Sequence, residues 1–583
     1  MSASAQAATF SGYDAALRAR NRRLADIVVL LAVAVLFWLL IELGQGVAAP
    51  YDPEQAPAIV STDPGELPGY AGRSLLRMFA ALAASVLFSC VVATVAARVP
   101  RAERVLIPLL DVLQSVPVLG FLSVTIGVWL SLFPGTMIGI ELAAIFAIFT
   151  SQVWNMTFAF YQSLITQPRD LDEASRMLGL TGWQRFWQLD APHGAFPLVW
   201  NGMMSFGGGW FFLIASEVIT VNHRTLALPG IGAYAAAAAQ NAEPGRLVLA
   251  MIVMIVMIVT VNFVFWRPLT AWAERFRMGD TDTVEPQRSL VLDLLRRSTV
   301  PRLLARTLRP VGEWLDRVTR PRGRGDRPRR RSFRRVRLID TLFALLAGGA
   351  LLWGLFAMLR FIAAETGLAE FGHAAALGAV TCARVLLLLA LGTVVWVPIG
   401  VWIGLNPRVT RVAQPVVQIL ASFPANFLFP FATLALLSTG ISLDLGGILL
   451  MSLGAQWYIL FNVIAGAAAI PNDLREAAKN LRLGRIATWR TLLWPGVLSS
   501  WVTGALTAAG GAWNASIVAE VVSYGDQTLV ATGLGAFIAE ATEHGDFARV
   551  LIGVIVMSVF VVGMNRLVWR RLYALAETRY ALS

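Results

Sequence analysis

The sequence predicts an all-α polytopic membrane protein, with twelve transmembrane helices arranged as two parallel six-helix repeats. Three observations carry this prediction. Of the 583 residues, 57% are hydrophobic and 14% are charged, whereas a soluble protein has roughly a quarter of its residues charged. Apolar stretches long enough to cross a hydrocarbon layer of about 30 Å recur along the chain. The second half of the chain also repeats motifs of the first half in the same order.

Each half contains six apolar stretches, and we expect each stretch to form one helix across the membrane. Those of the first half lie at residues 27–43, 76–97, 105–130, 138–162, 196–219 and 247–267. Those of the second half lie at residues 339–359, 379–404, 414–438, 444–468, 499–522 and 548–569. Because six is an even number, both halves enter the membrane from the same side, and the repeats are parallel.

The first apolar stretch, 27–43, has an alternative interpretation. Arginines precede it, and the small residues Ala48 and Ala49 follow it, which is also typical of a cleaved signal peptide. The stretch 339–359 occupies the same place in the second repeat, in the middle of the chain, where a signal peptide cannot lie. We therefore expect 27–43 to be a retained span.

The repeat is clearest after the fourth span of each half. The sequence Asp-Leu-Asp-Glu-Ala-Ser at 170–175 returns as Asp-Leu-Arg-Glu-Ala-Ala at 473–478, and Trp154 and Trp457 precede them at the same spacing. One membrane module has therefore been duplicated and fused. We divide the chain into a first repeat, a linker and a second repeat, at 1–275, 276–336 and 337–583. The cores of the repeats are 73–270 and 380–572, and the first and second repeated loops are 168–195 and 471–498.

Positive charge gathers in the linker. Between Glu274 and Arg337 there are 19 Arg and 8 acidic residues, so this segment carries +11 of the formal charge of +12. A nucleic-acid-binding tail is one interpretation. However, basic residues between spans ordinarily stay on the cytoplasmic side and contact anionic lipid at ~1 kcal/mol each. We therefore expect membrane lipid and no nucleic acid as a partner, with both termini, the linker and both repeated loops cytoplasmic. The Leu- and Arg-rich stretch 290–318 suits short helices on the inner leaflet.

The repeated loops have the composition of a helix that another protein contacts. Pro168 and Pro471 suit a helix start, and the aspartates that follow can cap it. An acidic residue then precedes two very small side chains. Small side chains let another surface approach the backbone closely, and the acid offers its charge to a basic partner. The residues concerned are Asp170, Glu173, Ala174 and Ser175 in the first loop, and Asp473, Glu476, Ala477 and Ala478 in the second.

The first loop continues with Gly179 and Pro192, and this pattern resembles the signature loop of permease subunits of ATP-binding-cassette importers. In that family the loop forms a coupling helix seated in a cleft of the cytoplasmic ATPase. The resemblance, over 73–270 and 380–572, implies the type I (MetI-like) permease fold. It also implies that the residues of the two loops named above dock the ATPase, together with Gly179 and its counterpart Arg482.

Other residues are similar to those of the nitrate/sulfonate/taurine branch of this family, which includes fused, duplicated anion transporters. These residues are Arg77, Ser115-x-Pro117, and Glu217 followed by Gly230-x-Gly232. One departure from the family pattern is that Arg482 stands where the first loop has Gly179, with Gly484 as the nearest glycine. We therefore expect the second loop to turn differently, so that its contact with an ATPase need not match the first.

Charged residues within spans need a reason, because each costs ~2.5–3.5 kcal/mol to insert. Arg77 and Arg384 are matched between the repeats, as are Glu217 and Glu520. They either form ion pairs between spans or line a path for an anion. Neutral amides in the spans either bond between helices or contact a solute. The candidates for the translocation path are therefore Arg77, Arg384, Glu217, Glu520, Asn155, Asn426 and Asn514.

The chain carries no ATPase motif of its own. Its single lysine, Lys479, follows no Gly-x-x-x-x-Gly, so a phosphate-binding loop is absent from the sequence. We expect two copies of a separate ATPase and an extracytoplasmic solute-binding protein as partners, no cofactor, no enzymatic activity, and the bacterial inner membrane as the location. Cys90 and Cys382 fall in apolar stretches at unmatched positions and are expected to be packing residues.

The function expected is that of a permease which imports a small solute, an anion by resemblance, through alternating access driven by the ATPase. The alternative is a twelve-span secondary transporter, whose turn between spans two and three is often Arg-rich, as 98–104 is here. Two observations argue against it: the long Glu-Ala loops, and the lack of an acid at the centre of a span for proton coupling. A membrane-bound enzyme is a third class, but the chain shows no Ser/His or His/Asp/Glu constellation.

Overall fold

The computed structural model describes residues 25–31, 34, 60–114, 116, 118–221, 224–276, 290–319 and 333–580. Among these residues, nine helices are long and apolar enough to cross a membrane, and a tenth crossing is present if one bent pair of helices counts as a span. The helical polytopic fold is confirmed, whereas the count of twelve spans is not. Most of the expected first span, 27–43, lies outside the described residues, as do 277–289 and 320–332 of the linker.

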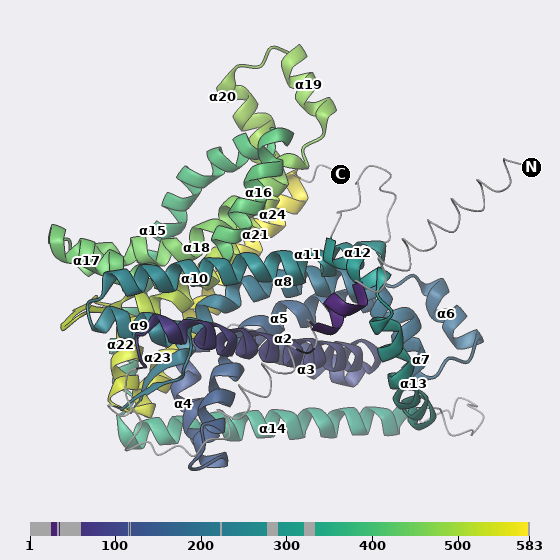
Figure 1. Cartoon of the computed structure of the whole chain (residues 1–583), viewed down its shortest axis with the longest axis horizontal. Coiled ribbons are helices and arrows are strands. Elements are labelled where there is room, and N and C mark those ends of the chain that lie inside the picture. The colour runs from purple at the N-terminus through teal and green to yellow at the C-terminus, as the bar shows by residue number, and fades with distance from the viewer. Residues whose placement is uncertain are drawn as a thin grey trace, which may run out of the picture.

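In the part of the first half that the structure describes, the elements include six long helices, two short helices in the repeated loop, a β-hairpin and a helix directly after the hairpin. Figure 1 shows how they are arranged. The long helices are α2 (Leu67–Arg98), α3 (Pro100–Gln114), α4 (Val118–Leu132), α5 (Ile138–Ile165), α8 (Ala191–Glu217) and α10 (Pro244–Val261). The others are α6 (Arg169–Met177), α7 (Gly182–Arg185), β1 (Val218–Val221), β2 (Arg224–Ala227) and α9 (Ile231–Gln240). The chain continues from α10 through a π-turn into α11 (Arg267–Ala273).

The second half repeats this order. Its long helices are α15 (Glu370–Gly404), α16 (Pro407–Ser422), α17 (Phe429–Thr439), α18 (Leu443–Ala468), α21 (Trp494–Ala519) and α23 (Phe547–Met564). Its shorter elements are η5 (Ala425–Leu428), α19 (Asn472–Asn480), α20 (Arg485–Thr488), β3 (Val521–Tyr524), β4 (Gln527–Val530), α22 (Leu534–Glu543) and α24 (Arg570–Tyr580). Both hairpins are antiparallel and in the same register, with Val218 opposite Ala227 and Val521 opposite Val530. The linker contributes α12 (Leu290–Arg297) and α13 (Val300–Thr319), and α14 (Phe333–Glu365) follows it.

The third span of each half is broken, so the continuous helices expected at 105–130 and 414–438 are wrong. In the second half, α16 ends at Ser422, and the chain bends by 77° before it continues as η5 and α17. Pro424 explains the break, because it has no N–H to donate and disfavours the helical conformation at Phe423, whose ψ is 126°. In the first half, α3 ends at Gln114 and α4 begins at Val118, and Ser115 and Pro117 lie outside the described residues.

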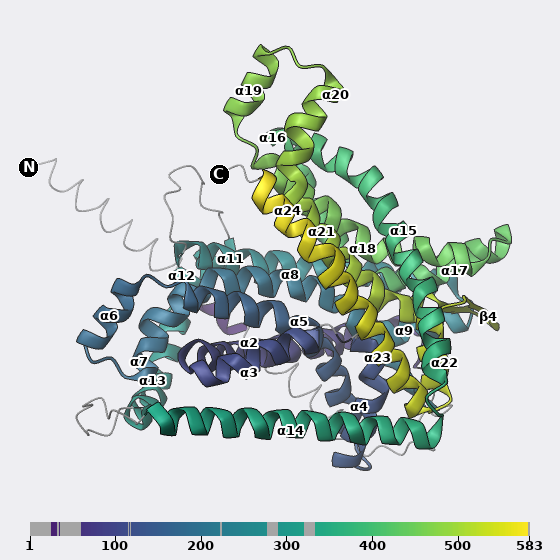
Figure 2. The same ribbon diagram turned by 180° about the vertical axis from the view of Figure 1, so that it is seen from behind.

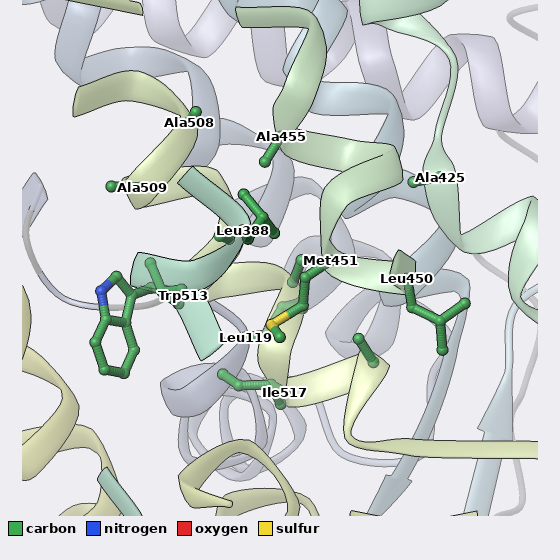
Figure 3. Packing of buried hydrophobic residues seen from close by; sticks show 14 of the residues in the cluster. Leu119, Leu388, Ala425, Leu450, Met451, Ala455, Ala508, Ala509, Trp513 and Ile517 are labelled. Carbon is green, nitrogen blue, oxygen red and sulfur yellow. The ribbon is translucent and has the colours of Figure 1, made fainter. Parts of the chain in front are cut away.

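The core of each half includes residues of the other, because each half sends part of its broken span into the other. Helix α4 of the first half packs against α21, α22 and α23 of the second, while α16 and η5 of the second half pack against α8 of the first. Leu119, at the start of α4, is buried in the same cluster as Met451 and Trp513 of the second half (Figure 3). The halves are therefore intertwined across their interface.

The repeated loops project from the molecule at two separate places (Figures 1 and 2). In both views the helices α2, α5 and α8 run alongside one another towards α6 and α7, whereas α18 and α21 run towards α19 and α20 (Figures 1 and 2). Each loop is thus carried at one end of the bundle that belongs to its own half.

Candidate functional site

The first repeated loop forms the short helix α6, which presents an acid and a small side chain on its exposed side. Pro168 precedes the helix, and Asp170 and Asp172 lie in its first turn, where their negative charge interacts favourably with the helix dipole. Glu173 and Ala174 are exposed, and Ser175 is buried. The following Met177 and Leu178 are large apolar side chains that stand out from the protein, 88% and 75% exposed.

The second repeated loop presents the same features on α19. Glu476 and Ala477 are exposed, and Ala478 is buried in the place of Ser175. Leu481 is 73% exposed, at the position that corresponds to Leu178. An acid, a small side chain and an exposed leucine therefore form a matched surface at the tip of both loops.

Both loops also turn in the same way, so the expectation of a different second turn is wrong. Gly179 has φ +62°, and Arg482, at the matched position, has φ +49°. The N–H of Leu180 donates to the Ser175 carbonyl at 3.1 Å, and Leu483 makes the same bond to Ala478 at 3.1 Å. These bonds end the helix at a residue in the left-handed conformation, which glycine adopts most easily. Arg482 therefore holds a strained backbone conformation in the second loop.

A network of four charged side chains attaches the first loop to the bundle. Arg98, at the end of α2, forms an ion pair with Asp190 and lies 3.6 Å from an oxygen of Asp172. Arg185 of α7 forms an ion pair with Asp172 and lies 3.8 Å from Asp190. Burial alone would raise the pKa of Asp172. The hydrogen bond and charge of Arg185, with the charges of Arg176 and Arg98, hold that pKa below its ordinary value.

The second loop lacks the residues that form this network. The positions that match Arg98, Asp172, Arg185 and Asp190 are Leu405, Arg475, Thr488 and Leu493. Arg475 instead donates to the Leu405 carbonyl at 3.0 Å and to the Asn472 side chain at 3.2 Å. The two loops therefore present similar residues at their tips but are attached to the bundle by different contacts.

At the other end of each half, a buried cluster of charges surrounds the matched arginine. In the first half, the Arg77 guanidinium lies 2.7 Å from a carboxylate oxygen of Glu217 and 2.6 Å from one of Glu141. All three side chains are less than a tenth exposed. Arg77 also donates to the Pro229 carbonyl at 3.0 Å. Because Arg77 is on α2, Glu141 on α5 and Glu217 on α8, one cation connects three long helices.

The Gly230-x-Gly232 motif allows α9 to begin directly on this cluster. The N–H of Gly232 donates to Glu217 at 2.6 Å, and the N–H of Ile231 donates to the hydroxyl of Ser74, which in turn bonds Glu217. A Cβ at Gly230 would overlap the Glu217 carboxylate. The glycines are needed because a carboxylate occupies the space of their side chains and accepts the first N–H groups of a helix.

The second half repeats the arrangement of this cluster with some of its partners changed. Arg384 lies 2.9 Å from Glu520, which accepts from the Thr381 hydroxyl at 2.8 Å and from the N–H of Ala536 at 3.1 Å. The second acid is Asp444, which is half exposed, whereas Glu141 is buried. Our sequence reasoning missed Glu141 and Asp444. An acid at the same place in both fourth spans was the signal that could have revealed them.

A cavity of about 630 Å³ lies between the two halves. Its walls come chiefly from α5, α8, α18 and α21, and it is lined by amide, hydroxyl and indole side chains among apolar ones. Asn155 and Asn514 line it, whereas Asn426 and the four charged candidates, Arg77, Arg384, Glu217 and Glu520, do not. Among the described residues, none that lines this cavity carries a charged side chain.

Two hydrogen bonds join the halves beside this cavity. Asn514 accepts from the N–H of Val118 at 3.0 Å, and Asn426 donates to the carbonyl of Phe211 at 3.2 Å. The contacts lie at related places in the two halves, because Asn514 matches Phe211 and Asn426 matches Leu119. Both amides belong to the second half, so the fused chain closes the interface with unlike contacts on its two sides.

Apolar helices long enough to cross a membrane and a cavity between two repeated halves are features expected of a membrane transport protein. Comparison with known families agrees: the model of the "binding-protein-dependent transport system inner membrane component" matches residues 85–275 and 396–572. The chain belongs to this family, the permease components of ATP-binding-cassette importers, and contains its domain twice.

Individual relatives each match about 30% of the chain. A nitrate import permease of Leptolyngbya laminosa is 26% identical over 30% of this chain and 58% of its own length. A bicarbonate transport permease of Synechococcus elongatus is 25% identical over 31% of the chain and 61% of its own length. The taurine transport permease of Escherichia coli is 24% identical over 31% and 62%. The matches thus span about three fifths of these relatives.

Gly230→Ala should break the first buried cluster. The added methyl group overlaps the Glu217 carboxylate and forces it away from Arg77, and separating such a buried pair costs roughly 3–5 kcal/mol. Thermal unfolding of the purified protein should show a clear fall in melting temperature. The control is Gly245→Ala, whose new methyl group meets no atom within 4 Å. Equal melting of both variants would contradict the role given to this glycine.

Asp172→Asn should loosen the first loop and leave the second unchanged. Because its carboxylate is held by Arg185, amide exchange in α6 and α7 should become severalfold faster at neutral pH. The pKa of Asp172 is lowered, so its contribution is complete above the ordinary pKa of 3.8 and is lost as pH falls through the lowered value. Wild type and variant should therefore converge in acid. Asp170→Asn, in the same helical turn, is the control, and an equal effect from it would refute the assignment.

Arg482→Gly should stabilise the second loop. Glycine adopts a positive φ without steric cost, so the change should remove about 1 kcal/mol of backbone strain. Amide exchange in α19 should then slow about fivefold. Gly179→Ala is the reciprocal variant, and it should speed exchange in α6 by a similar factor. Faster exchange in Arg482→Gly would show that the arginine side chain stabilises the turn by more than its strain costs.

Proposed function

We propose that the protein forms the transmembrane pathway of an ATP-driven importer of a small anion. Two ATPase subunits dock on its repeated loops from the cytoplasm, and a solute-binding protein delivers the anion at the opposite face of the bacterial inner membrane. In this arrangement both termini and the linker are cytoplasmic. Family membership supports the role of permease, and the matched tips of the two loops support two docking sites.

The observation that carries this proposal is how the loops are connected to the cavity. The first loop leaves the end of α5 at Ile165 and returns as α8, and the second leaves α18 at Ala468 and returns as α21. These same four helices form the walls of the cavity. A displacement of either loop by an ATPase is therefore delivered directly to two walls, and alternating access follows when the halves rock against each other.

The solute we propose is an anion of the kind that the relatives are named for: nitrate, bicarbonate or a sulfonate such as taurine. The cavity supports this class because no acidic side chain among the described residues lines it, and because amides, hydroxyls and indoles can donate to an oxyanion. Asn155 and Asn514, which line the cavity, are the residues that we propose contact the passing solute. The Arg77 and Arg384 clusters act outside the path, by holding each half together.

The test is to reverse the charge of both docking acids. Glu173→Arg with Glu476→Arg places like charge where a basic groove of the ATPase should bind, so co-purification of the ATPase and solute-stimulated ATP hydrolysis should both be lost. Glu543→Arg, at an exposed acid at the end of α22, is the control, with the same charge change per substituted residue. If the double variant retained the ATPase and its stimulation, docking through these loops would be refuted.

A further inference from the structure

The linker helix α13, which we call the strut, packs against the first half at α7. Helix α13 lies across the direction of α2, α5 and α8, beside the loop end of the first half, in both views of the molecule (Figures 1 and 2). A helix in this position runs along the membrane surface when the long helices cross the membrane. Helix α13 directly follows α12 in the chain, and α12 packs against α11.

Hydrogen bonds anchor this strut at both ends. At its start, the carboxylate of Asp26 accepts from the N–H of Thr299 at 2.6 Å and from the Thr299 and Ser298 hydroxyls. At its other end, Asp316 accepts from the Thr181 hydroxyl and, at 3.1 Å, from the Gln184 side chain. Thr181 and Gln184 are also the two residues that cap α7 in the first repeated loop. The strut is therefore bonded to the part of the loop that leads into α8.

The opposite side of α13 is apolar and exposed. Leu303, Val311, Trp314 and Val318 are between 53% and 63% exposed, and their spacing places them on one side of the helix. Gly312 and Asp316, which face α7, fall on the other side of the helix. An apolar stripe with no cover from the described protein is an energetic liability in water.

Exposed arginines accompany this stripe. Arg306 and Arg317 flank it on α13, and Arg296 and Arg297 precede it at the end of α12. A helix with an apolar side, an interfacial tryptophan and flanking arginines has the composition that binds an anionic bilayer surface. The position of α13 across the ends of the long helices places it where that surface lies.

We propose that α13 binds the anionic phospholipid of the inner leaflet, and that through Asp316 this binding holds the first repeated loop in place. The second loop cannot respond in this way. Thr181 and Gln184 are replaced there by Gly484 and Ala487, which have no side-chain donor for a carboxylate. Lipid composition therefore acts on one loop of the two. The proposal does not depend on which solute is carried or on how an ATPase docks.

The experiment compares the full-length protein, without ATPase, in nanodiscs of phosphatidylcholine alone and with added phosphatidylglycerol. Amide exchange should slow roughly tenfold in α13 when the anionic lipid is present. Exchange should slow together with it in α7, but not in α19 and α20. The second loop thus serves as a control within the same molecule. Soluble glycerol phosphate should have no effect in phosphatidylcholine discs.

Substitutions at two places separate the binding of lipid by α13 from its effect on the first repeated loop. Arg306→Gln with Arg317→Gln should abolish the lipid effect in both α13 and α7, whereas Arg570→Gln with Arg571→Gln, two exposed arginines of the last helix, should not. Asp316→Ala should leave the lipid effect on α13 intact and remove it from α7. An unchanged response of α7 in Asp316→Ala would overturn the coupling. Protection of α13 that is independent of anionic lipid and appears only with an ATPase or a second copy of the chain would overturn the choice of partner.

Discussion

Each half of the protein is built around one buried arginine that two carboxylates and the start of a short helix surround. Removing such ions from water costs several kcal/mol for each ion, and only close pairing and satisfied hydrogen bonds recover that cost. Arg77 achieves this with Glu217, Glu141 and the Pro229 carbonyl, and Glu217 accepts from the first turn of α9 as well. The arrangement leaves little freedom, because moving any one helix exposes a buried charge. The glycine pair at the start of α9 follows from this requirement, because a Cβ at either position would overlap the Glu217 carboxylate.

The clusters and the repeated loops lie at opposite ends of the long helices, and this division defines what can move. At the cluster end, α2, α5 and α8 are held by full charges within each half. Between the halves, apolar packing of α4, α16 and η5 is accompanied by single hydrogen bonds of amide side chains, each worth about 1 kcal/mol. The charged contacts within a half are therefore stronger than these individual polar contacts between the halves. Each half is expected to move as a unit, with the cavity at the surface where the two separate.

The duplication, the helical class and the acidic loops could all be predicted from the sequence, because they depend on composition and on motifs that recur in register. The break in the third span could not be located, since periodicity alone shows an apolar run and Pro424 acts through the conformation of its neighbour. Glu141 was overlooked because a single acid in an apolar stretch has no visible partner until the helices are packed. The turn at Arg482 was predicted wrongly because the bonds that close a helix end outweigh the preference of one residue.

The two loops show how a fused duplication can diverge where a homodimer cannot. Their tips remain alike, with an acid, a small side chain and an exposed leucine, which is the pattern that two equivalent partners would require. Their attachments differ: Arg98, Arg185 and two aspartates fasten the first loop, whereas Arg475 and backbone groups support the second. The first loop is also the one that the linker strut reaches, through Asp316. The additional charges and the strut thus restrain the same loop. The second loop keeps a strained turn and fewer restraints, so the two docking sites are alike in what they present and unlike in how freely they move.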